Sequence, residues 1–467
     1  ISFSEKQTDS DNALETDEKK KIYSTEELAE PDLSYDDQFF FKRKSMIPDN
    51  ERSVGEYVQP SNQKINKGYN EQVVVKNLPD GTKPRIFEMD NKEVLVYIAP
   101  DLTLHNDENC FTLFYSVRRA GRDEEFSQPK RIMENPKVNG YLTNVMEFDG
   151  TVAMVSGRRR LVLVWTQGGL PVNLEYGEED VMKSTAIFTS NWREDDAKWS
   201  TVEAVSDVCG CLQFHPTIYT GGKGVQLEIT KRPDNRLKDI ETDFVLPESR
   251  DYYSLEKDGK WSLSQKGDFG DYRADFPFTD INSEIPWDYN YVLEADGSVA
   301  GALWSATDNM LFPGSVNCFV KTYIKSPETK KMIWTESVPV VYHNVQHQVK
   351  YPSGVLRPNG DLLITYLSAS DDGNNICVAT IKREPCLSTL SMEPYSEDMQ
   401  TPGKNIRFRM KLLNYGIGLT ENCDMVVKNA LKTEAGKITA KRVFYPGVVY
   451  TCDTVYEKLK GKDGVVP

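Results

Sequence analysis

Histidine is the first residue type to consider for chemistry, and the chain holds four: His105, His215, His343 and His347. The last two are four residues apart, a spacing that would place both on one face of a helix as metal ligands. However, no glutamate follows His343 as the helical zinc motif requires, and the valine-rich surroundings are typical of a loop or strand. The histidine pattern therefore predicts no metal site.

The eight cysteines offer a second kind of chemistry, thiol exchange or metal binding. Cys209 and Cys211 are separated by one glycine, so they could form a redox-active pair or half of a metal site, yet no second pair accompanies them at ligand spacing. Cys423 and Cys452 could form a disulfide bridge. Three others occupy equivalent strands of the repeats described below and are expected to be small buried residues: Cys110, Cys318 and Cys377.

An acidic loop at 371–375, with the sequence Asp-Asp-Gly-Asn-Asn, carries the carboxylate and amide oxygens that Ca²⁺ prefers. The same residue types are common in ordinary turns, because their side chains bond to the nearby backbone. No glutamate stands at the twelfth position of the loop, which an EF-hand requires. The sequence thus predicts no cofactor, with Ca²⁺ as the alternative for this loop.

The elements that would position these residues form a strand pattern that recurs at irregular intervals. Each copy joins a strand to a more apolar strand through a turn rich in glycine, asparagine or aspartate, and then adds a third strand and a polar edge strand. The expected first and second strands fall at 85–97, 152–165, 216–229, 291–304 and 354–366. The third strands fall at 110–115, 186–189, 252–255, 318–323 and 376–381. An aromatic residue followed by serine or threonine opens each expected edge strand, at 126–129, 199–202, 261–263 and 334–338.

The last copy lacks an edge strand after residue 381, whereas an additional strand at 72–76 precedes the first copy. In a β-propeller, an N-terminal strand can complete the last blade and so close the ring. The sequence therefore predicts an all-β fold: a five- or six-bladed β-propeller closed by an N-terminal strand. A sixth blade would lie within 38–70 or 265–288.

In such a ring, the residue that precedes the first strand of a blade approaches the central channel. Four residues occupy this place, and they form the candidate ligand-binding face: Arg85, His215, Tyr289 and Tyr351. The alternative for each is an ordinary packing role in a loop. No catalytic residue is assigned.

Residues 70–383 resemble bacterial secreted and surface propellers with sialidase-like blades. Members of this group carry the Asp-box turn S-x-D-x-G-x-x-W between the third and fourth strands. The segment 254–261 looks like a slipped copy, because it keeps Asp-Gly-x-Trp and displaces the serine, and 191–199 is a more degenerate copy. The resemblance implies a glycan-related function.

For an active member, the resemblance also implies a retaining sialidase mechanism with three arginines, a tyrosine nucleophile assisted by glutamate, and an aspartic acid. Arg85, in a Pro-Arg-Ile-Phe context, resembles the first of these arginines. The arginines at 158–160 occupy a hairpin turn, where a solvated charge cluster is expected. The remaining roles have no assignable residue.

After residue 384 the pattern becomes strand, Pro-Gly turn, strand and Asn-x-Gly turn, the last at 414–416. This is similar to the small immunoglobulin-like modules of bacterial adhesion proteins and predicts a compact β-sandwich. Residues 1–37 hold twelve acidic residues against four lysines, so they predict an acidic linker. The predicted organisation has three parts. Residues 1–70 form an acidic lead-in or linker that can hold extra strands, 71–384 form the propeller, and 385–467 form the immunoglobulin-like module. Because the chain opens on isoleucine without a signal peptide, it is expected to be part of a longer polypeptide.

The net charge of −15 would repel phosphate backbones, so nucleic acid is not an expected partner. The longest apolar run, 161–165, is far shorter than the roughly 20 residues that a membrane helix needs. The sequence favours a secreted or cell-surface propeller that binds a glycan or a protein through one face of its ring. The alternatives are a sialidase-type glycoside hydrolase and a structural spacer in a larger surface protein.

Overall fold

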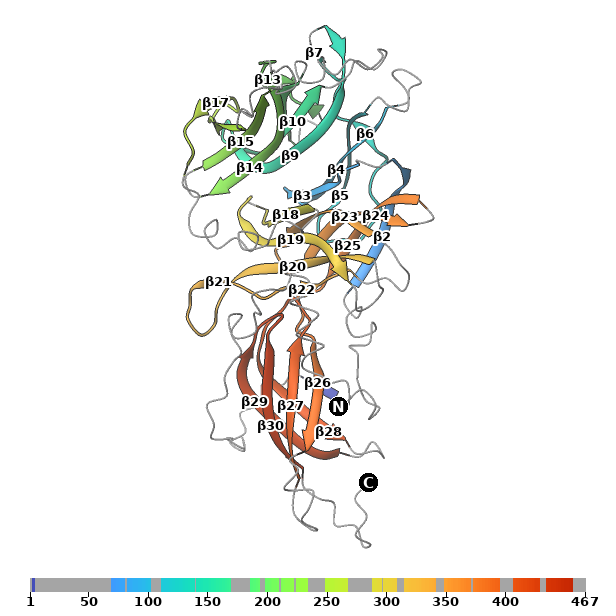
Figure 1. The fold of residues 1–467 in the computed structure, drawn as a ribbon, viewed down its shortest axis with the longest axis vertical. Coiled ribbons are helices and arrows are strands. Elements are labelled where there is room, and N and C mark those ends of the chain that lie inside the picture. Colours follow the sequence, from blue (N-terminus) through green and yellow to red (C-terminus); the bar gives the residue numbers. More distant parts are fainter. Residues whose placement is uncertain are drawn as a thin grey trace, which may run out of the picture.

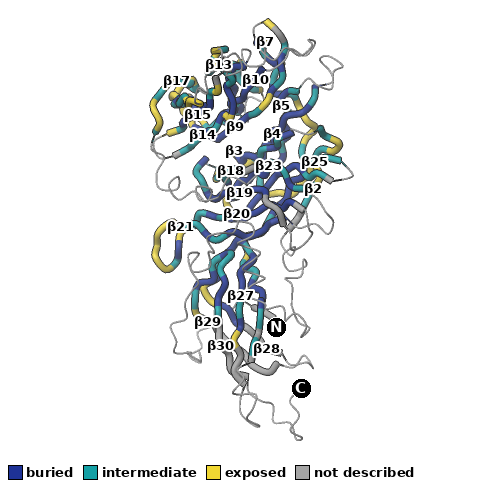
Figure 2. Tube along the Cα trace, in the orientation of Figure 1, coloured by how far each residue is buried: buried dark blue, intermediate teal, exposed yellow. Residues whose placement is uncertain are grey.

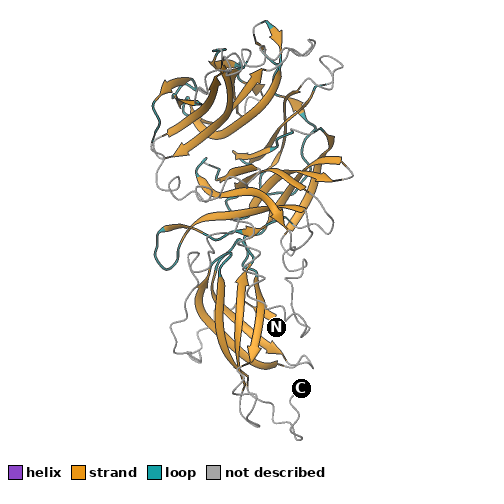
Figure 3. Ribbon diagram, in the orientation of Figure 1, coloured by secondary structure: helices purple, strands orange, loops and turns teal. Residues whose placement is uncertain are grey.

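A computed structural model describes residues 2–4, 69–79, 82–101, 111–138, 140–168, 185–193, 198–209, 211–221, 224–233, 248–267, 288–295, 297–308, 315–341, 348–370, 373–394, 406–428 and 434–456. Every regular element in these ranges is a β-strand (Figures 1 and 3), which confirms the predicted all-β class. Within the same ranges, no helix is long and apolar enough to cross a bilayer.

The region from β3 to β25 is a succession of antiparallel meanders. The first sheet is β3 (Arg85–Met89), β4 (Lys92–Pro100), β5 (Phe111–Arg119) and β6 (Lys130–Arg131). The second is β9 (Asn144–Val155), β10 (Arg158–Gly168), β11 (Ala186–Arg193), β12 (Lys198–Trp199) and β13 (Glu203–Ser206), preceded by the hairpin β7 (Lys137–Val138) and β8 (Tyr141–Leu142). The third is β14 (Cys211–Gly221), β15 (Gly224–Pro233), β16 (Ser249–Leu255) and β17 (Trp261–Ser264).

The fourth and fifth meanders join through a short parallel pairing of their first strands, Val292 with Gly354. The fourth contains β18 (Asp288–Leu293), β19 (Val299–Asp308), β20 (Ser315–Lys325), β21 (Met332–Trp334) and β22 (Val338–Pro339). The fifth contains β23 (Gln348–Leu356), β24 (Leu362–Ser370), β25 (Gly373–Ile381) and β2 (Tyr69–Leu78). The predicted hairpins are thus present in the described residues.

The strand β2 comes first in this region of the chain but pairs with β25, at the far end of the last meander, with Val73 opposite Cys377. This confirms the predicted pairing of the N-terminal strand. A core of apolar residues also joins the first and last meanders, with Ile86 and Leu95 packed against Val355 and Leu363. Similar cores join the first to the second meander and the fourth to the fifth. These contacts support the predicted propeller. Figure 2 shows β4 largely buried, whereas the edge strands β17 and β21 are more exposed.

Several first strands begin earlier than predicted. Strand β9 begins at Asn144 rather than 152, and β14 and β23 also extend toward the N-terminus. The dipeptide Asp149-Gly150 resembles a hairpin turn, yet it lies inside β9. A Cβ atom on Gly150 would lie 2.6 Å from Leu163 Cδ2 and 2.8 Å from Phe87 Cζ, so the glycine serves close packing between sheets rather than a turn.

The edge strand predicted at 126–129 is wrong, because the ladder to β5 forms instead at Lys130–Arg131. Pro129 has no N–H to donate, and the Ser127 hydroxyl takes a ladder position by accepting the Val117 N–H at 3.0 Å. A side-chain hydroxyl also takes the place of a backbone carbonyl as the acceptor directly after Trp199 and after Trp334. Ser200 Oγ accepts from Asn191 N at 3.0 Å, and Thr335 Oγ1 accepts from Thr322 N at 2.9 Å.

Replacing Thr335 by valine is expected to lower the unfolding free energy by about 1 to 2 kcal/mol, because the buried Thr322 N–H then has no acceptor. Chemical denaturation measures the change. The matched control is Ser127→Ala, which removes the same kind of bond at an exposed site where water can replace the hydroxyl. Equal losses in the two variants would contradict this explanation.

The C-terminal region consists of two three-stranded sheets. One contains β26 (Leu387–Pro394), β27 (Ile406–Asn414) and β30 (Val449–Tyr456), and the other contains β28 (Thr420–Lys428), β29 (Glu434–Phe444) and β1 (Ser2–Ser4). Their shared core includes Leu412 and Phe444. The pairing of β1 with β28 places the start of the predicted lead-in in this region. These sheets lie below β20–β22 in Figure 1, where the hydroxyl of Tyr445 bonds to Ser326 Oγ at 2.8 Å.

Candidate functional site

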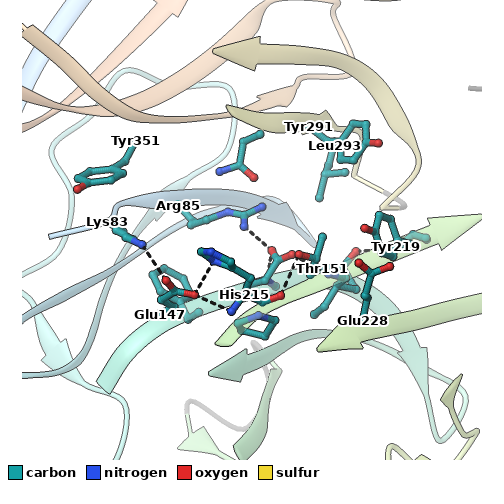
Figure 4. Close-up of a pocket in the computed structure, with 18 of the residues that line it drawn as sticks. Lys83, Arg85, Glu147, Thr151, His215, Tyr219, Glu228, Tyr291, Leu293 and Tyr351 are labelled. Carbon is teal, nitrogen blue, oxygen red and sulfur yellow. Dashed lines mark hydrogen bonds and ion pairs between the residues drawn. The ribbon is translucent and has the colours of Figure 1, made fainter. Parts of the chain in front are cut away.

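A cavity of about 490 Å³ opens where the first strands of the meanders converge. Strands β3, β9, β14, β18 and β23, or the residues beside them, all contribute to its wall, as does β16 through Arg250. Figure 4 shows Lys83, Glu147 and Tyr351 at one side and Tyr219, Glu228 and Tyr291 at the other. We call this space the inner cavity. Concave sites of this size, with a few convergent polar groups, are typical of small-ligand binding.

Two residues of the inner cavity have a strained backbone. His215 has φ 49° and Tyr351 has φ 54°, in the left-handed region that residues other than glycine rarely adopt. Each stands just before a proline and inside a β-bulge, in β14 and β23 respectively. Such conformations are destabilising by about 1 to 3 kcal/mol and are found mainly at ligand sites. The bulges aim both side chains at the cavity, in equivalent places of two meanders.

One side of the cavity is organised around the carboxylate of Glu147. Its Oε2 atom accepts from the His215 backbone N–H at 2.8 Å and lies 2.9 Å from His215 Nδ1, and its Oε1 atom is 3.6 Å from Lys83 Nζ. Burial by itself raises the pKa of Glu147, but the hydrogen bonds from His215 and the charge of Lys83 lower it to about 2. The carboxylate therefore fixes the strained His215 backbone and stays charged.

Acidification is expected to remove the stabilisation that Glu147 provides. Because its folded pKa of about 2 lies below the ordinary 4.5, the native state binds this proton less readily than the unfolded chain. The contribution is therefore present above about pH 4.5 and is lost as the pH falls toward the folded pKa. Unfolding free energies of the unmodified protein and of Glu147→Gln, measured between about pH 6 and pH 3, should converge as the pH falls. A constant difference would contradict the assignment.

The floor of the cavity is a buried ion pair between Arg85 of β3 and Asp149 of β9. Asp149 Oδ1 accepts from Arg85 Nη1 and from its neighbour Gly150 N at 2.6 Å, and Oδ2 accepts from Ile218 N of β14 at 2.7 Å. Burial raises the pKa of Asp149, while the Arg85 charge and the two backbone donors oppose that rise. One carboxylate thus ties together the first strands of three successive meanders.

The opposite side carries a second ion pair together with Tyr219 and Tyr291. Glu228 Oε1 accepts from Arg250 Nη1 at 2.9 Å, and the Glu228 carboxyl is nearly buried. Tyr252 stands opposite Glu228 in the β15–β16 ladder. Burial raises the pKa of Tyr252, and the negative charge of Glu228 raises it further. Thr151 and Thr220 bring two hydroxyls together at 2.9 Å on the wall between the two sides.

The structure brings three of the four candidate face residues to the inner cavity: Arg85, His215 and Tyr351. Tyr289 lies in β18 opposite Trp304, but its side chain lies outside the described residues, and its neighbours Asn290 and Tyr291 line the cavity instead. Five charged wall residues were not predicted from the sequence: Lys83, Glu147, Asp149, Glu228 and Arg250. A usable signal existed for Lys83 and Arg85, which flank Pro84 directly before a first strand.

The arginines at 158–160 are not the solvated cluster that was expected. Only Arg158 is exposed. Arg159 Nη2 donates to Ala295 O at 2.7 Å, in the turn after β18, and Arg160 Nη1 donates to Asn191 Oδ1 at 2.7 Å. The Arg159 bond joins the second meander to the turn after β18, and the Arg160 bond lies within the second meander. None of the three arginines lines the inner cavity.

No group of three metal-ligating side chains occurs within the described part of the chain. The Sγ atoms of Cys209 and Cys211 are 2.8 Å apart at an exposed site, so the redox-pair alternative stays a prediction. Cys318, Cys377 and Cys423 are buried. His105, His343, His347, Cys110, residues 371–372 and the side chain of Cys452 lie outside the described residues, and so do the corresponding predictions.

No protein-family model and no curated protein matches the chain. Among solved structures, it is similar to a Trypanosoma rangeli sialidase in complex with the inhibitor DANA, at 10% identity and a TM-score of 0.36 over 67% of this chain and 59% of that one. It is also similar to the NanB sialidase from Streptococcus pneumoniae, at 9% identity and a TM-score of 0.36 over 71% and 72%, and to a glycoside hydrolase, at 11% and 0.34 over 70% and 97%. The chain thus spans less than two thirds of the length of the Trypanosoma rangeli enzyme.

Proposed function

We propose that this protein binds a glycan through the inner cavity. The observation that carries the proposal is the convergence of Arg85, His215 and Tyr351 on one cavity, two of them in strained conformations at equivalent bulges. Backbone strain persists where the surrounding structure holds it, and it accompanies ligand sites more often than ordinary packing.

The groups that line the cavity suit a sugar. A saccharide presents hydroxyls that both donate and accept hydrogen bonds, together with patches of C–H. The wall offers hydroxyls from Thr151 and Thr220, carboxylate oxygens from Glu147 and Glu228, and the ring of Tyr351, which already packs within 5.5 Å of Lys83 Nζ. Aromatic rings supply apolar contact at a low entropic cost, because few torsions must be fixed.

Binding to a printed glycan array, followed by calorimetry with the strongest hits, tests the proposal. Tyr351→Ala should weaken binding at least about tenfold, corresponding to about 1.4 kcal/mol. The matched control is Leu263→Ala, which removes an exposed apolar side chain from β17, outside the cavity. Binding that Tyr351→Ala leaves unchanged would place the ligand elsewhere, and absence of all glycan binding would favour a protein ligand or a structural spacer.

Sialidase-type hydrolysis is the second candidate, and one observation favours it. Glu228 lines the cavity with Arg85 and Arg250. Tyr252 stands opposite Glu228 on the adjacent strand and is not itself a lining residue. A tyrosine with a carboxylate partner is the nucleophile arrangement that sialidases use. Hydrolysis of fluorogenic glycosides by the purified protein, lost in Glu228→Gln and retained in Leu263→Ala, would establish this activity. If none of the glycosides is hydrolysed, glycan binding without hydrolysis is the function.

The same proposal extends to the architecture and the setting. We infer that the five meanders are five blades of a closed propeller and that the two C-terminal sheets form an immunoglobulin-like module. The ring is supported by β2 on β25 and by the apolar cores between meanders. A glycan-binding ring joined to such a module suits a secreted or cell-surface protein. Protection from externally added protease, lost on cell lysis, would contradict that location.

A further inference from the structure

Building on the proposed function, we infer that the inner cavity selects uncharged saccharides over saccharides that carry a carboxylate, and that Glu147 enforces this choice. The basis is the pairing of charges in the wall. Three basic side chains line the cavity, Lys83, Arg85 and Arg250, together with three carboxylates, Glu147, Asp149 and Glu228.

Each of these cations already has a carboxylate partner. Arg250 Nη1 lies 2.9 Å from Glu228 Oε1, Lys83 Nζ lies 3.6 Å from Glu147 Oε1, and Arg85 bonds directly to Asp149. The positive charges of Lys83, Arg85 and Arg250 are therefore each offset by an adjacent carboxylate. Arginine binds a ligand carboxylate through paired N–H donors, but Arg85 turns one of its terminal nitrogens toward Asp149 instead.

A carboxylate ligand would have to displace one of the wall carboxylates or lie beside them. Displacing Asp149 would break its bonds to Arg85 and to the Ile218 N–H, which join three meanders. Lying beside Glu147 would bring two negative charges together in a partly buried site, where Coulomb repulsion is stronger than in water. The low pKa of Glu147 means that this charge persists across the neutral and mildly acidic range.

An uncharged sugar meets no such penalty. Its hydroxyls can donate to Glu147 and Glu228 and accept from Lys83 or Arg85 without separating any pair. Among the three carboxylates, Glu147 is the one whose loss the fold tolerates best, since its side chain is 21% exposed against 9% for Asp149 and 8% for Glu228. Its amide equivalent also keeps an acceptor for the His215 N–H. Glu147 is therefore the position at which selectivity can be changed.

The test measures the affinity of purified protein for matched pairs of glycans that end either in a neutral sugar or in sialic or uronic acid. We expect the unmodified protein to bind the neutral member at least about tenfold more tightly, with the preference decreasing at high salt. Glu147→Gln should shift the ratio of the two affinities about tenfold toward the acidic member, so the ratio and not the neutral affinity is the readout. The matched control is Glu124→Gln, the same chemical change at an exposed site away from the cavity.

Failure of the selectivity and failure of the proposed glycan binding give different results. If acidic glycans bind as tightly as neutral ones, or more tightly, and Tyr351→Ala abolishes that binding, the selectivity is wrong while glycan binding through the cavity stands. If Glu147→Gln leaves the preference unchanged, Glu147 does not enforce it. If no glycan binds in a way that depends on Tyr351, the proposed function and the selectivity both fail.

Discussion

Replacing Glu93 by alanine is expected to lower the unfolding free energy by about 3 to 5 kcal/mol, because two buried guanidinium groups then lose the buried carboxylate that bonds to both, and only the partly exposed Asp123 stays near them. Glu93 Oε2 accepts from Arg118 Nε at 2.6 Å, and Oε1 accepts from Arg357 Nε at 2.8 Å. All three side chains are at most 3% exposed. Water cannot replace the missing charge at such a site. Urea denaturation followed by tryptophan fluorescence measures the loss.

The matched control is Glu124→Ala, which removes the partner of Arg122 from a pair that is more than half exposed on both sides. Exposed pairs contribute little because solvent screens them. A second variant separates the charge from the packing. Replacing Arg118 and Arg357 by methionine and leucine in the Glu93→Ala background should recover much of the stability, since apolar residues can substitute for a buried ion network. A loss below about 1 kcal/mol in Glu93→Ala would show that the network is not needed.

Asp149→Ala is expected to lower the unfolding free energy by about 3 to 5 kcal/mol, as much as the Glu93 change. Unlike the Glu93 change, it should also abolish ligand binding at the inner cavity. The substitution leaves the Arg85 guanidinium without its buried partner and the Ile218 N–H without its acceptor. The first strands of three meanders then lose their shared bonding group. Thermal unfolding and glycan binding should both be affected.

Adding Arg85→Met to Asp149→Ala provides the control. Removing the Arg85 guanidinium should recover part of the unfolding free energy, because a buried cation without a counter-charge is the main source of the loss. Ligand binding should stay absent, since both polar groups of the cavity floor are then missing. Full recovery of binding in the double variant would contradict the assignment of this pair to the site.

Much of the fold could be predicted because turns and strands carry local signals. Asparagine, aspartate and glycine in turns located the hairpins. The additional strand at 72–76 pointed to its pairing with the last meander. Local signals do not decide the conformation where tertiary packing does. Asp149-Gly150 reads as a turn, but Phe87 and Leu163 pack against the glycine within a continuous strand.

The candidate site was predicted only in part, for a related reason. Arg85, His215 and Tyr351 could be found because each stands near the start of a first strand. Charged residues inside strands, such as Glu93, Glu147 and Glu228, look like solvent-facing positions in a sequence. Their roles depend on partners that are distant in the chain: Glu93 pairs with Arg357 and Glu147 with His215. Local periodicity cannot reveal such pairs.

The pairing of β2 with β25 also sets the order of events during synthesis. Val73 leaves the ribosome long before its partner Cys377 exists. At about 5 to 20 residues per second, roughly 300 intervening residues take about 15 to 60 s to make. During that interval the apolar segment Val73-Val74-Val75 has no β25 strand with which to form hydrogen bonds. Pairing of β2 with β25 is therefore a late step that follows translation of the last meander. Truncated chains that end before β25 would expose a strand edge prone to pair with other chains.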